Sequence, residues 1–179
     1  MNVLVLTFHP NLALSKVNRH LFDQVKQSKL PNLRIYDEYR LYPDEKIVVQ
    51  QEQVALAWAD RIVLQFPFYW YSCPPLLKKW EDQVLEHGWA YGSGGNKLHG
   101  KELLLAISAG APKSKYQHDG EFGVTLPELL LPFRSTSNLI GTKFLSPFIV
   151  YNAMAISDTD LQAAGKAYCQ YLSALGLDK

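Results

Sequence analysis

Short apolar runs alternate with amphipathic segments along this chain, a pattern typical of strands and helices that follow one another in a parallel α/β fold. Four runs are continuous and rich in leucine and β-branched residues, as expected of strands that are buried on both faces. They predict strands at residues 2–8, 33–36, 61–66 and 102–108. A fifth strand is predicted at residues 143–150 near an edge of the sheet, because Pro147 interrupts this run and cannot donate a ladder hydrogen bond.

The segments between the strands repeat apolar residues at intervals of three and four, which is helical spacing. Ser15 is a suitable N-cap for the first helix, and Pro75 is suited to the start of the third. We therefore expect helices over residues 15–25, 50–60, 75–84, 125–139 and 158–175. Residues 37–47 are predicted to form a polar loop, and the five glycines within residues 87–100 predict a mobile loop that acts as an active-site flap.

Strands separated by helices at this interval imply right-handed βαβ units and a parallel sheet. We predict one domain over residues 1–179 with an α/β, flavodoxin-like three-layer sandwich, in which a five-stranded parallel sheet has the order 2-1-3-4-5. This order makes the first and third strands neighbours. Ligands bind at the carboxyl ends of the strands beside such a switch point, so the turns after these two strands are expected to share one site.

The balance of charge argues against one class of partner. A formal net charge of +1, without a run of lysine or arginine, gives no surface that would neutralise a nucleic-acid backbone, so we expect no nucleic-acid partner. The two cysteines form no paired motif, which suits a reducing compartment. No apolar run approaches the roughly 20 residues that span a bilayer. We expect a cytoplasmic protein that is peripheral to the membrane only through a partner.

The turn after the first predicted strand has the features of an anion site. A helix that begins after Ser15 directs the free N–H groups of its first turn, and the positive end of its dipole, toward the mouth of that strand. Ser15 and Asn18 offer side-chain donors, and His9 or Lys16 offers a positive charge. We expect a phosphate at His9 and at residues 15–18, which include Val17.

The turn after the third strand contains four consecutive aromatic residues, Phe68, Tyr69, Trp70 and Tyr71. Such a cluster at the ligand-binding edge of a sheet favours a flat ligand, although aromatic residues are also common in cores and dimer contacts. A phosphate site and an aromatic wall in one crevice together suit flavin mononucleotide (FMN), whose own ring performs the redox chemistry. The candidate cofactor is therefore FMN, and Trp70 is a candidate catalytic residue.

The chain resembles the flavodoxin-like NAD(P)H:quinone oxidoreductases, and most closely the small ancillary oxidoreductases of glutathione-regulated potassium efflux systems. The resemblance covers nearly the whole chain. It rests on His9-Pro10 with Ser15 and Asn18, on Phe66-Pro67-Phe68-Tyr69-Trp70-Tyr71-Ser72, on Pro74-Pro75-Leu76-Leu77-Lys78, and on His87-Gly88-Trp89-Ala90-Tyr91-Gly92 leading to Leu98-His99-Gly100-Lys101.

This resemblance implies FMN phosphate at His9 and residues 15–18, and the flavin N5 and carbonyl edge along the backbone of residues 68–71. It also implies a second ring-binding turn, where the family usually has Thr-Thr-Gly-Gly and this chain has Ser108-Ala109-Gly110-Ala111. We expect Ala111 and the following Pro112 to narrow the backbone freedom of this turn and to weaken cofactor binding. Tyr116 matches the position of an active-site tyrosine that is implicated in hydride transfer in the larger quinone reductases, so the resemblance makes it a second candidate catalytic residue.

The resemblance further implies NADPH or NADH as electron donor, a quinone or similar electrophile as acceptor, and a homodimer in which Tyr91 and the glycine-rich loop cover the flavin of the partner. Two alternatives remain open at the level of the sequence. One is a regulatory subunit of a potassium efflux antiporter, in which the flavin has a structural or sensing role. The other is a one-electron flavodoxin, although such carriers usually have a strongly acidic surface and this chain does not.

Two further side-chain types have simpler interpretations. Cys73 has no histidine nearby in the sequence to activate it, and we interpret it as an inert, small hydrophobic residue. The five histidines have no metal-binding spacing, so we expect no metal site.

Overall fold

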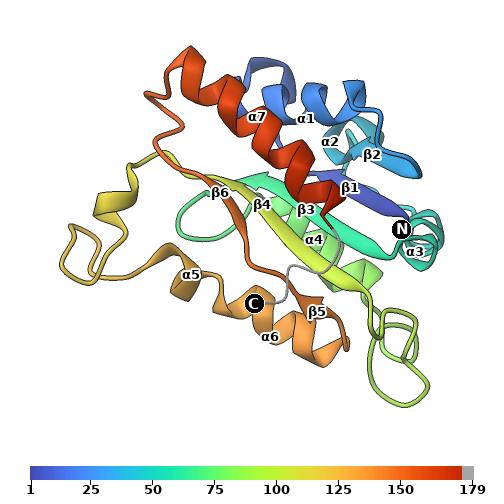
Figure 1. Ribbon diagram of the computed structural model, residues 1–179. Coiled ribbons are helices and arrows are strands. Elements are labelled where there is room, and N and C mark those ends of the chain that lie inside the picture. The colour runs from blue at the N-terminus through green and yellow to red at the C-terminus, as the bar shows by residue number, and fades with distance from the viewer. Residues whose placement is uncertain (175–179) are drawn as a thin grey trace.

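A central parallel sheet organises the computed structural model, which describes residues 1–174 (Figure 1). Its strands are β1 (Val3–Thr7), β2 (Leu33–Asp37), β3 (Arg61–Pro67), β4 (Glu102–Ser108), β5 (Lys143–Phe144) and β6 (Phe148–Val150). They lie in the order β2-β1-β3-β4-β5, and β6 pairs with β4 further along the same edge. The predicted strand order 2-1-3-4-5 and the parallel α/β fold class are confirmed.

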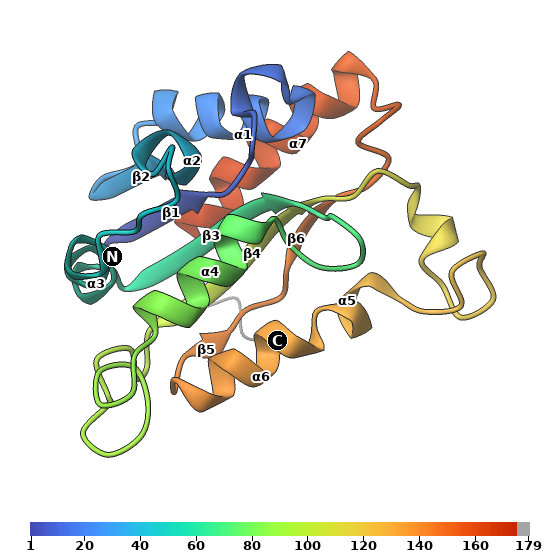
Figure 2. The same cartoon turned by 180° about the vertical axis from the view of Figure 1, so that it is seen from behind.

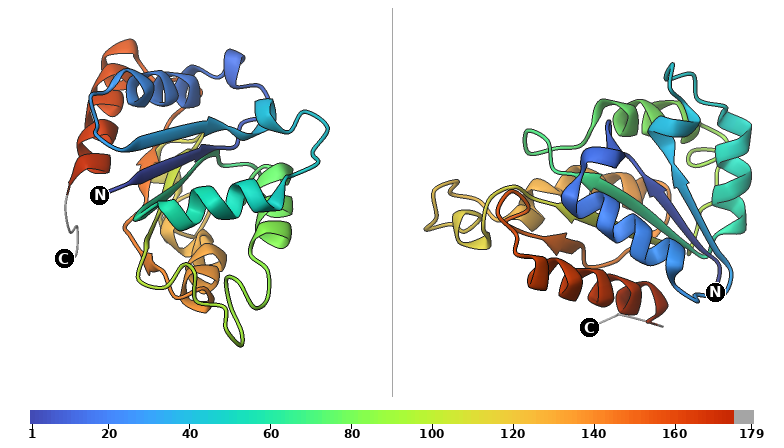
Figure 3. Two further views of the ribbon diagram at one scale, coloured as in Figure 1. Left: turned by 90° about the vertical axis from the view of Figure 1, so that its right-hand side faces the viewer. Right: turned by 90° about the horizontal axis from the view of Figure 1, so that it is seen from above.

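The helices form the two outer layers. They are η1 (Leu12–Leu14), α1 (Lys16–Gln27), α2 (Glu38–Leu41), α3 (Val49–Trp58), α4 (Pro75–Val84), η2 (Lys113–Lys115), α5 (Leu126–Leu129), α6 (Leu131–Leu139) and α7 (Asp158–Ser173). Helices α1 and α7 cover one face of the sheet, whereas α3, α4 and α6 cover the other (Figure 2). The three layers are separated clearly when the molecule is viewed from the side (Figure 3).

The alternation of side chains along the buried strands divides the core into two parts. In β1, Val3 and Val5 pack in the cluster that contains α1 and α7, whereas Leu4 and Leu6 pack in the cluster that contains α3 and α4. All five residues of β1 are buried. This explains why the central strands appear in the sequence as continuous apolar runs rather than as alternating ones.

Three predicted element boundaries were wrong. The predicted fifth strand is divided into β5 and β6, because the segment that contains Pro147 leaves the ladder between them. The predicted loop at residues 37–47 begins with α2, which is capped by the Asp37 carboxylate accepting a hydrogen bond from the Arg40 N–H. The predicted helix at 125–139 is two helices, α5 and α6.

Helix α7 ends at Ser173, and the predicted end at Leu175 lies outside the described residues.

The glycine-rich loop at residues 87–100, predicted to be an active-site flap, does not lie over the candidate site of its own chain. It connects the end of α4 to the start of β4, so it lies at the amino ends of the strands, opposite the ligand-binding edge (Figure 1). Ala90 and Leu98 anchor it in the core. A Cβ atom at Gly95 would lie 2.1 Å from the Tyr91 carbonyl oxygen. The glycine there is needed for close backbone packing.

Candidate functional site

The three turns that follow β1, β3 and β4 meet at one edge of the sheet. Thr7 pairs in register with Gln65, and Pro67 pairs with Ser108, so the three strands end side by side. Segments that are far apart in the sequence therefore lie together at the carboxyl ends of neighbouring parallel strands, where open α/β sheets bind their ligands.

The turn after β1 presents free backbone donors. Ser15 is the N-cap of α1, and its hydroxyl accepts a hydrogen bond from the Asn18 N–H at 3.1 Å. The N–H groups of Lys16 and Val17 precede Asn18 in the first helical turn and have no intrahelical acceptor. They point out of the amino end of α1 together with the positive end of the helix dipole, as a phosphate site requires.

The side chains of this turn do not supply the positive charge that the sequence suggested. Burial lowers the pKa of His9, and its Nδ1 atom accepts a hydrogen bond from the Asn11 N–H at 3.1 Å, so the neutral ring keeps its proton on Nε2. The Lys16 ammonium donates to the Ile156 carbonyl at 2.9 Å and pairs with Asp158 at 3.0 Å. An anion at this turn would therefore be bound mainly by backbone N–H groups and by neutral donors.

Ser108 connects all three turns. Its hydroxyl accepts a hydrogen bond of 2.7 Å from the Asn18 side-chain amide, and its carbonyl accepts one of 2.9 Å from the Phe68 N–H. Gln65 adds a bond of 2.9 Å to the Asn18 carbonyl. One donor of the Asn18 amide is thus used to hold the first and third turns together, a positioning role that the sequence did not indicate.

Three buried oxygen atoms under this junction lack a hydrogen-bond partner among the described residues. They are Thr7 Oγ1, Asn18 Oδ1 and Gln65 Oε1. Buried polar atoms without partners cost free energy unless water or a ligand satisfies them. Their position suits a site in which water or a bound ligand supplies the missing hydrogen bonds.

The aromatic turn after β3 has a tight, strained backbone. The Ser72 N–H donates to the Tyr69 carbonyl at 2.9 Å, and the two residues between them, Trp70 and Tyr71, have φ angles of 48° and 60°. Non-glycine residues avoid this left-handed region, and such strain is commonly retained at functional sites. The Trp70 side chain is 93% exposed, which gives the turn a large apolar surface directed away from the core.

Behind the aromatic turn, Tyr116 occupies the centre of an aromatic cluster. Its ring lies 6.3 Å from that of Phe68, 4.9 Å from that of Phe122 and 5.8 Å from that of Tyr151. Tyr116 is 6% exposed, and burial raises the pKa of its hydroxyl, so the phenol is neutral at physiological pH. Tyr116 therefore supports the wall of the site and presents little surface of its own.

The turn after β4 accommodates its departure from the family pattern without strain. Neither Gly110 nor Ala111 has a positive φ angle, so alanine at the last position has no conformational cost of the kind that was expected. Ala109 is fully buried, and its N–H donates to the Val150 carbonyl at 2.9 Å. The N–H groups of Gly110 and Ala111 have no partner among the described residues and are available to a ligand.

The structure thus brings together the predicted residues of the three turns, namely His9, Ser15, Lys16, Val17, Asn18, Phe68, Tyr69, Trp70, Tyr71, Ser108, Ala109, Gly110 and Ala111. Gln65, Phe122 and Tyr151 were not predicted. Gln65 is a polar residue inside the apolar run of residues 62–66, and this signal could have indicated the first of them. Phe122 and Tyr151 come from loops whose course the sequence does not determine.

This fold and site define a flavodoxin-like protein. A family model described as the flavodoxin-like fold matches residues 1–172, and the chain belongs to this family, as the motifs indicated. The chain is 49% identical over 174 residues to the uncharacterized NAD(P)H oxidoreductase YrkL of Bacillus subtilis, covering 97% of this chain and 99% of that protein. It is 41% identical over 172 residues to the glutathione-regulated potassium-efflux system ancillary protein KefF of Salmonella typhimurium, covering 96% of each.

Solved structures with the same fold have varied descriptions. General stress protein 14 of Treponema denticola, in complex with FMN, has a TM-score of 0.91 and 37% identity, over 96% of this chain and 98% of that one. An NADPH-quinone reductase from P. pentosaceus has a TM-score of 0.87 and 30% identity, over 98% and 100%. A protein described as a thermophilic tryptophan halogenase from Streptomycin violaceusniger has a TM-score of 0.94 and 47% identity, over 97% and 99%.

No helix within residues 1–174 is long and apolar enough to cross a membrane. Within the same range, no group of three or more histidine, cysteine, aspartate or glutamate side chains has the arrangement of a metal site.

Proposed function

We propose that this protein is an FMN-dependent NAD(P)H:quinone oxidoreductase. The observation that carries the proposal is the junction at Ser108, which holds an amino-terminal helix turn with free N–H groups against a strained aromatic turn. A phosphate and an attached flat ring match these two surfaces in chemistry. The names of the relatives and of the FMN-bound solved structure support the same cofactor and the same donor.

The residues divide between the two parts of the cofactor. The N–H groups of Lys16 and Val17, the Ser15 hydroxyl and the His9 Nε2–H would bind the phosphate. The backbone of residues 68–71 and the N–H groups of Gly110 and Ala111 would meet the edge of the ring. Bound FMN would accept two electrons as a hydride from the nicotinamide and deliver them to a quinone.

The chain would contribute position and exclusion of water rather than an acid or a base. The φ angles of 48° and 60° at Trp70 and Tyr71 give the backbone of this turn a defined shape, which would limit the reorganisation needed to hold the ring. Trp70 offers a flat apolar face beside the reacting ring, and Tyr116 fixes Phe68 from behind. We assign Trp70 a role in contact with the reactants and Tyr116 a positioning role.

The test is the absorption spectrum and activity of the purified protein with added FMN. We expect a bound flavin and consumption of NADPH or NADH that depends on menadione. Absence of both would refute the proposal. The same preparation is then incubated with tryptophan, chloride and NADPH in air. We expect no chlorinated product, and its formation would instead favour the halogenase activity of the neighbour at 47% identity.

The proposed active form is a homodimer. A groove of about 350 Å³ between α4 and α6 is lined by apolar residues that include Leu85, Phe133 and Ile140, and by both Ser72 and Tyr91. Leu139 on its rim is 61% exposed. A second copy seated here would bring Tyr91 close to the aromatic turn of its partner. Analytical ultracentrifugation should give twice the monomer mass, and a monomer with full activity would contradict this assembly.

A second role is favoured by the 41% identity to a potassium-efflux ancillary protein. In that role the chain would be cytoplasmic and would dock on a membrane antiporter, and the flavin would have a structural or sensing role. The test is potassium efflux in cells that contain the antiporter and a variant without reductase activity. Retained efflux would show that docking suffices, whereas unchanged efflux after deletion of the gene would exclude this role.

A one-electron carrier is disfavoured by charge. The formal net charge is +1, whereas such carriers usually use a strongly acidic surface to steer toward their partners. A stable flavin radical during reductive titration would restore this alternative.

A further inference from the structure

A second hollow lies near the turn of residues 108–111. It has a volume of about 460 Å³ and lies between the η2 turn, the start of α5 and the end of the β6 edge. Tyr116 lines it, and the same ring contacts Phe68 in the aromatic cluster. The Asn152 N–H also donates to the Ala111 carbonyl at 2.9 Å, which fastens one wall of the hollow to the ring-binding turn.

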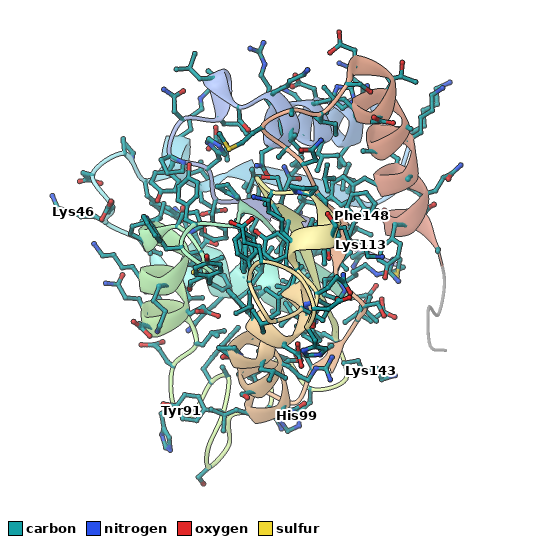
Figure 4. The ribbon with its side chains drawn as sticks, turned by 90° about the vertical axis from the view of Figure 1, so that its left-hand side faces the viewer. Lys46, Tyr91, His99, Lys113, Lys143 and Phe148 are labelled. Carbon is teal, nitrogen blue, oxygen red and sulfur yellow. The ribbon has the colours of Figure 1, made fainter. Side chains whose placement is uncertain are left out.

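The lining of this hollow suits a flat group with an attached anion. Tyr151 and Ile149 supply aromatic and apolar surface, while the Gln117 amide donates to the Lys113 carbonyl at 3.2 Å and the Thr125 hydroxyl donates to the Glu128 carboxylate at 2.7 Å. Lys113 is the charged residue of the lining, and no carboxylate contributes to it. Figure 4, which faces this side of the molecule, labels Lys113 beside the η2 turn.

Lys113 differs in its partners from the other lysine of the same turn. Among the described residues, the Lys113 ammonium has no ion pair, whereas Lys115 is paired with Glu121 at 2.6 Å. An unpaired ammonium at the mouth of an aromatic hollow attracts an anion without first breaking an existing contact.

Within residues 1–174, the groove between α4 and α6 is not lined by an unpaired ammonium. Its lining includes Lys78, but that ammonium is paired with Asp82, and Glu81 lies in the same lining. An anionic group there would meet two carboxyl side chains and no unpaired cation. Between these two hollows, the one beside η2 therefore suits a phosphorylated ligand better.

We propose that the hollow beside η2 binds the adenosine end of the electron donor, and that Lys113 pairs with the 2′-phosphate that distinguishes NADPH from NADH. This inference rests on the proposed reductase function and deepens it by specifying the donor. Adenine would lie against Tyr151 and Ile149, and the 2′-phosphate would face the ammonium. Lys113 is thus a specificity-determining residue and takes no part in hydride transfer.

Two adenosine fragments test the site without any turnover. Adenosine 2′,5′-bisphosphate and adenosine 5′-monophosphate, which differ only by the 2′-phosphate, are titrated calorimetrically into the protein with saturating FMN. We expect the wild type to bind the bisphosphate at least fivefold more tightly, from one charge-assisted contact. Lys113→Gln should abolish this preference. Lys115→Gln, which removes the same charge from the same turn, should retain it.

The kinetic counterpart uses the active enzyme. In Lys113→Gln, the ratio of kcat/KM for NADPH to that for NADH should fall by about fivefold, while the KM for menadione stays unchanged. Equal preference for the bisphosphate in wild type and Lys113→Gln, or an equal loss in Lys115→Gln, would overturn the assignment. If no donor is consumed but Lys113 still sets the fragment preference, only the reductase function fails. If turnover is normal but the preference is absent, only this site fails.

Discussion

At the scale of single residues, the site depends on hydrogen bonds that no short motif reveals. Ser108 accepts from both Asn18 and Phe68, so its two oxygen atoms fix the distance between the turn after β1 and the aromatic turn. The serine appears in the sequence only as the last residue of a strand. Its importance comes from residues that are 90 and 40 positions away in the chain.

The substitution Asn18→Asp tests the phosphate-binding turn. An aspartate at this position would place its own carboxylate at the positive end of α1, where it competes with a phosphate, and would remove the amide donor to Ser108. We expect the dissociation constant of FMN to rise by about tenfold or more. The dissociation constant of riboflavin, which lacks the phosphate, should change less.

A control for this substitution is Asn138→Asp, which makes the same chemical change at an exposed position on α6. It should leave both affinities unchanged. An equal loss of riboflavin and FMN binding in Asn18→Asp would show that the residue does not act through the phosphate.

Comparing Trp70→Ala with Trp70→Gly distinguishes the effect of the indole side chain from the effect of the backbone conformation of the aromatic turn. Both variants lose the indole face, so both should bind FMN more weakly than the wild type. Trp70 has a φ of 48°, which glycine adopts freely and alanine adopts at a cost of about 1 kcal/mol. Urea denaturation should therefore give Trp70→Gly a free energy of unfolding about 1 kcal/mol higher than that of Trp70→Ala, while fluorescence titration should give both variants the same reduced FMN affinity. Equal stabilities would show that the backbone geometry of this turn is unimportant.

At the scale of secondary-structure elements, the sequence was sufficient for the strands and helices that have long apolar patterns. It failed for α2, which is only four residues long and lies in a polar segment. It also failed at the fifth strand, where Pro147 indicated an interruption but not that two strands would pair separately with β4. Short elements depend on tertiary contacts, so their existence is poorly encoded in local spacing.

The same limit explains why the positive charge predicted for the turn after β1 is not available there. Lys16 is correctly placed in the chain, yet its ammonium is bound by Ile156 and Asp158 from the start of α7. Local sequence cannot reveal a partner that is 140 residues away. By contrast, the free N–H groups of the first helical turn follow from the helix start alone, which is why these donors were predictable.

Helix α7 is attached to the sheet by one buried arginine, and this attachment is testable. Arg61 is fully buried, contacts Glu102 at 2.6 Å, and donates to the carbonyls of Tyr171, Leu172 and Ala174. Arg61→Met should lower the free energy of unfolding by about 2–4 kcal/mol, because it leaves these acceptors unsatisfied. Urea denaturation followed by circular dichroism measures the change.

The matched control is Arg134→Met on α6, where the guanidinium is exposed and lies over the Phe144 ring at 5.6 Å. A change within about 0.5 kcal/mol is expected there. Similar denaturation midpoints for both variants would mean that Arg61 does not anchor the helix.

At the scale of the whole molecule, a buried carboxyl makes stability depend on pH. Glu38 is fully buried, and its oxygens have no hydrogen-bond partner among the described residues. Burial, followed by the charges of Glu52 and Asp37, raises the pKa of Glu38 from 4.5 to about 9. Between pH 4.5 and about 9, the folded protein keeps a proton on the Glu38 carboxyl that the unfolded chain releases. The contribution of Glu38 to stability is therefore complete below pH 4.5 and is lost as the pH rises toward 9.

The variant Glu38→Gln removes this titration while keeping the size of the side chain. The melting temperature of the wild type should fall between pH 5 and pH 9 more steeply than that of Glu38→Gln, with the largest difference at the alkaline end. The control Glu45→Gln changes a half-exposed carboxyl at the adjacent turn, 3.8 Å from the Lys79 ammonium, and should follow the wild type. Parallel curves for wild type and Glu38→Gln would mean that Glu38 is ionised in the folded state.

The central claim is that the turns after β1 and β3 form one binding site, with a phosphate on the first and a flat ring on the second. A crystal structure of the protein grown with FMN tests it most directly. We predict phosphate oxygens within hydrogen-bonding distance of the Lys16 and Val17 N–H groups, and the ring against the backbone of residues 68–71. Crystals in which FMN is absent, or in which it occupies the groove between α4 and α6, would contradict the account.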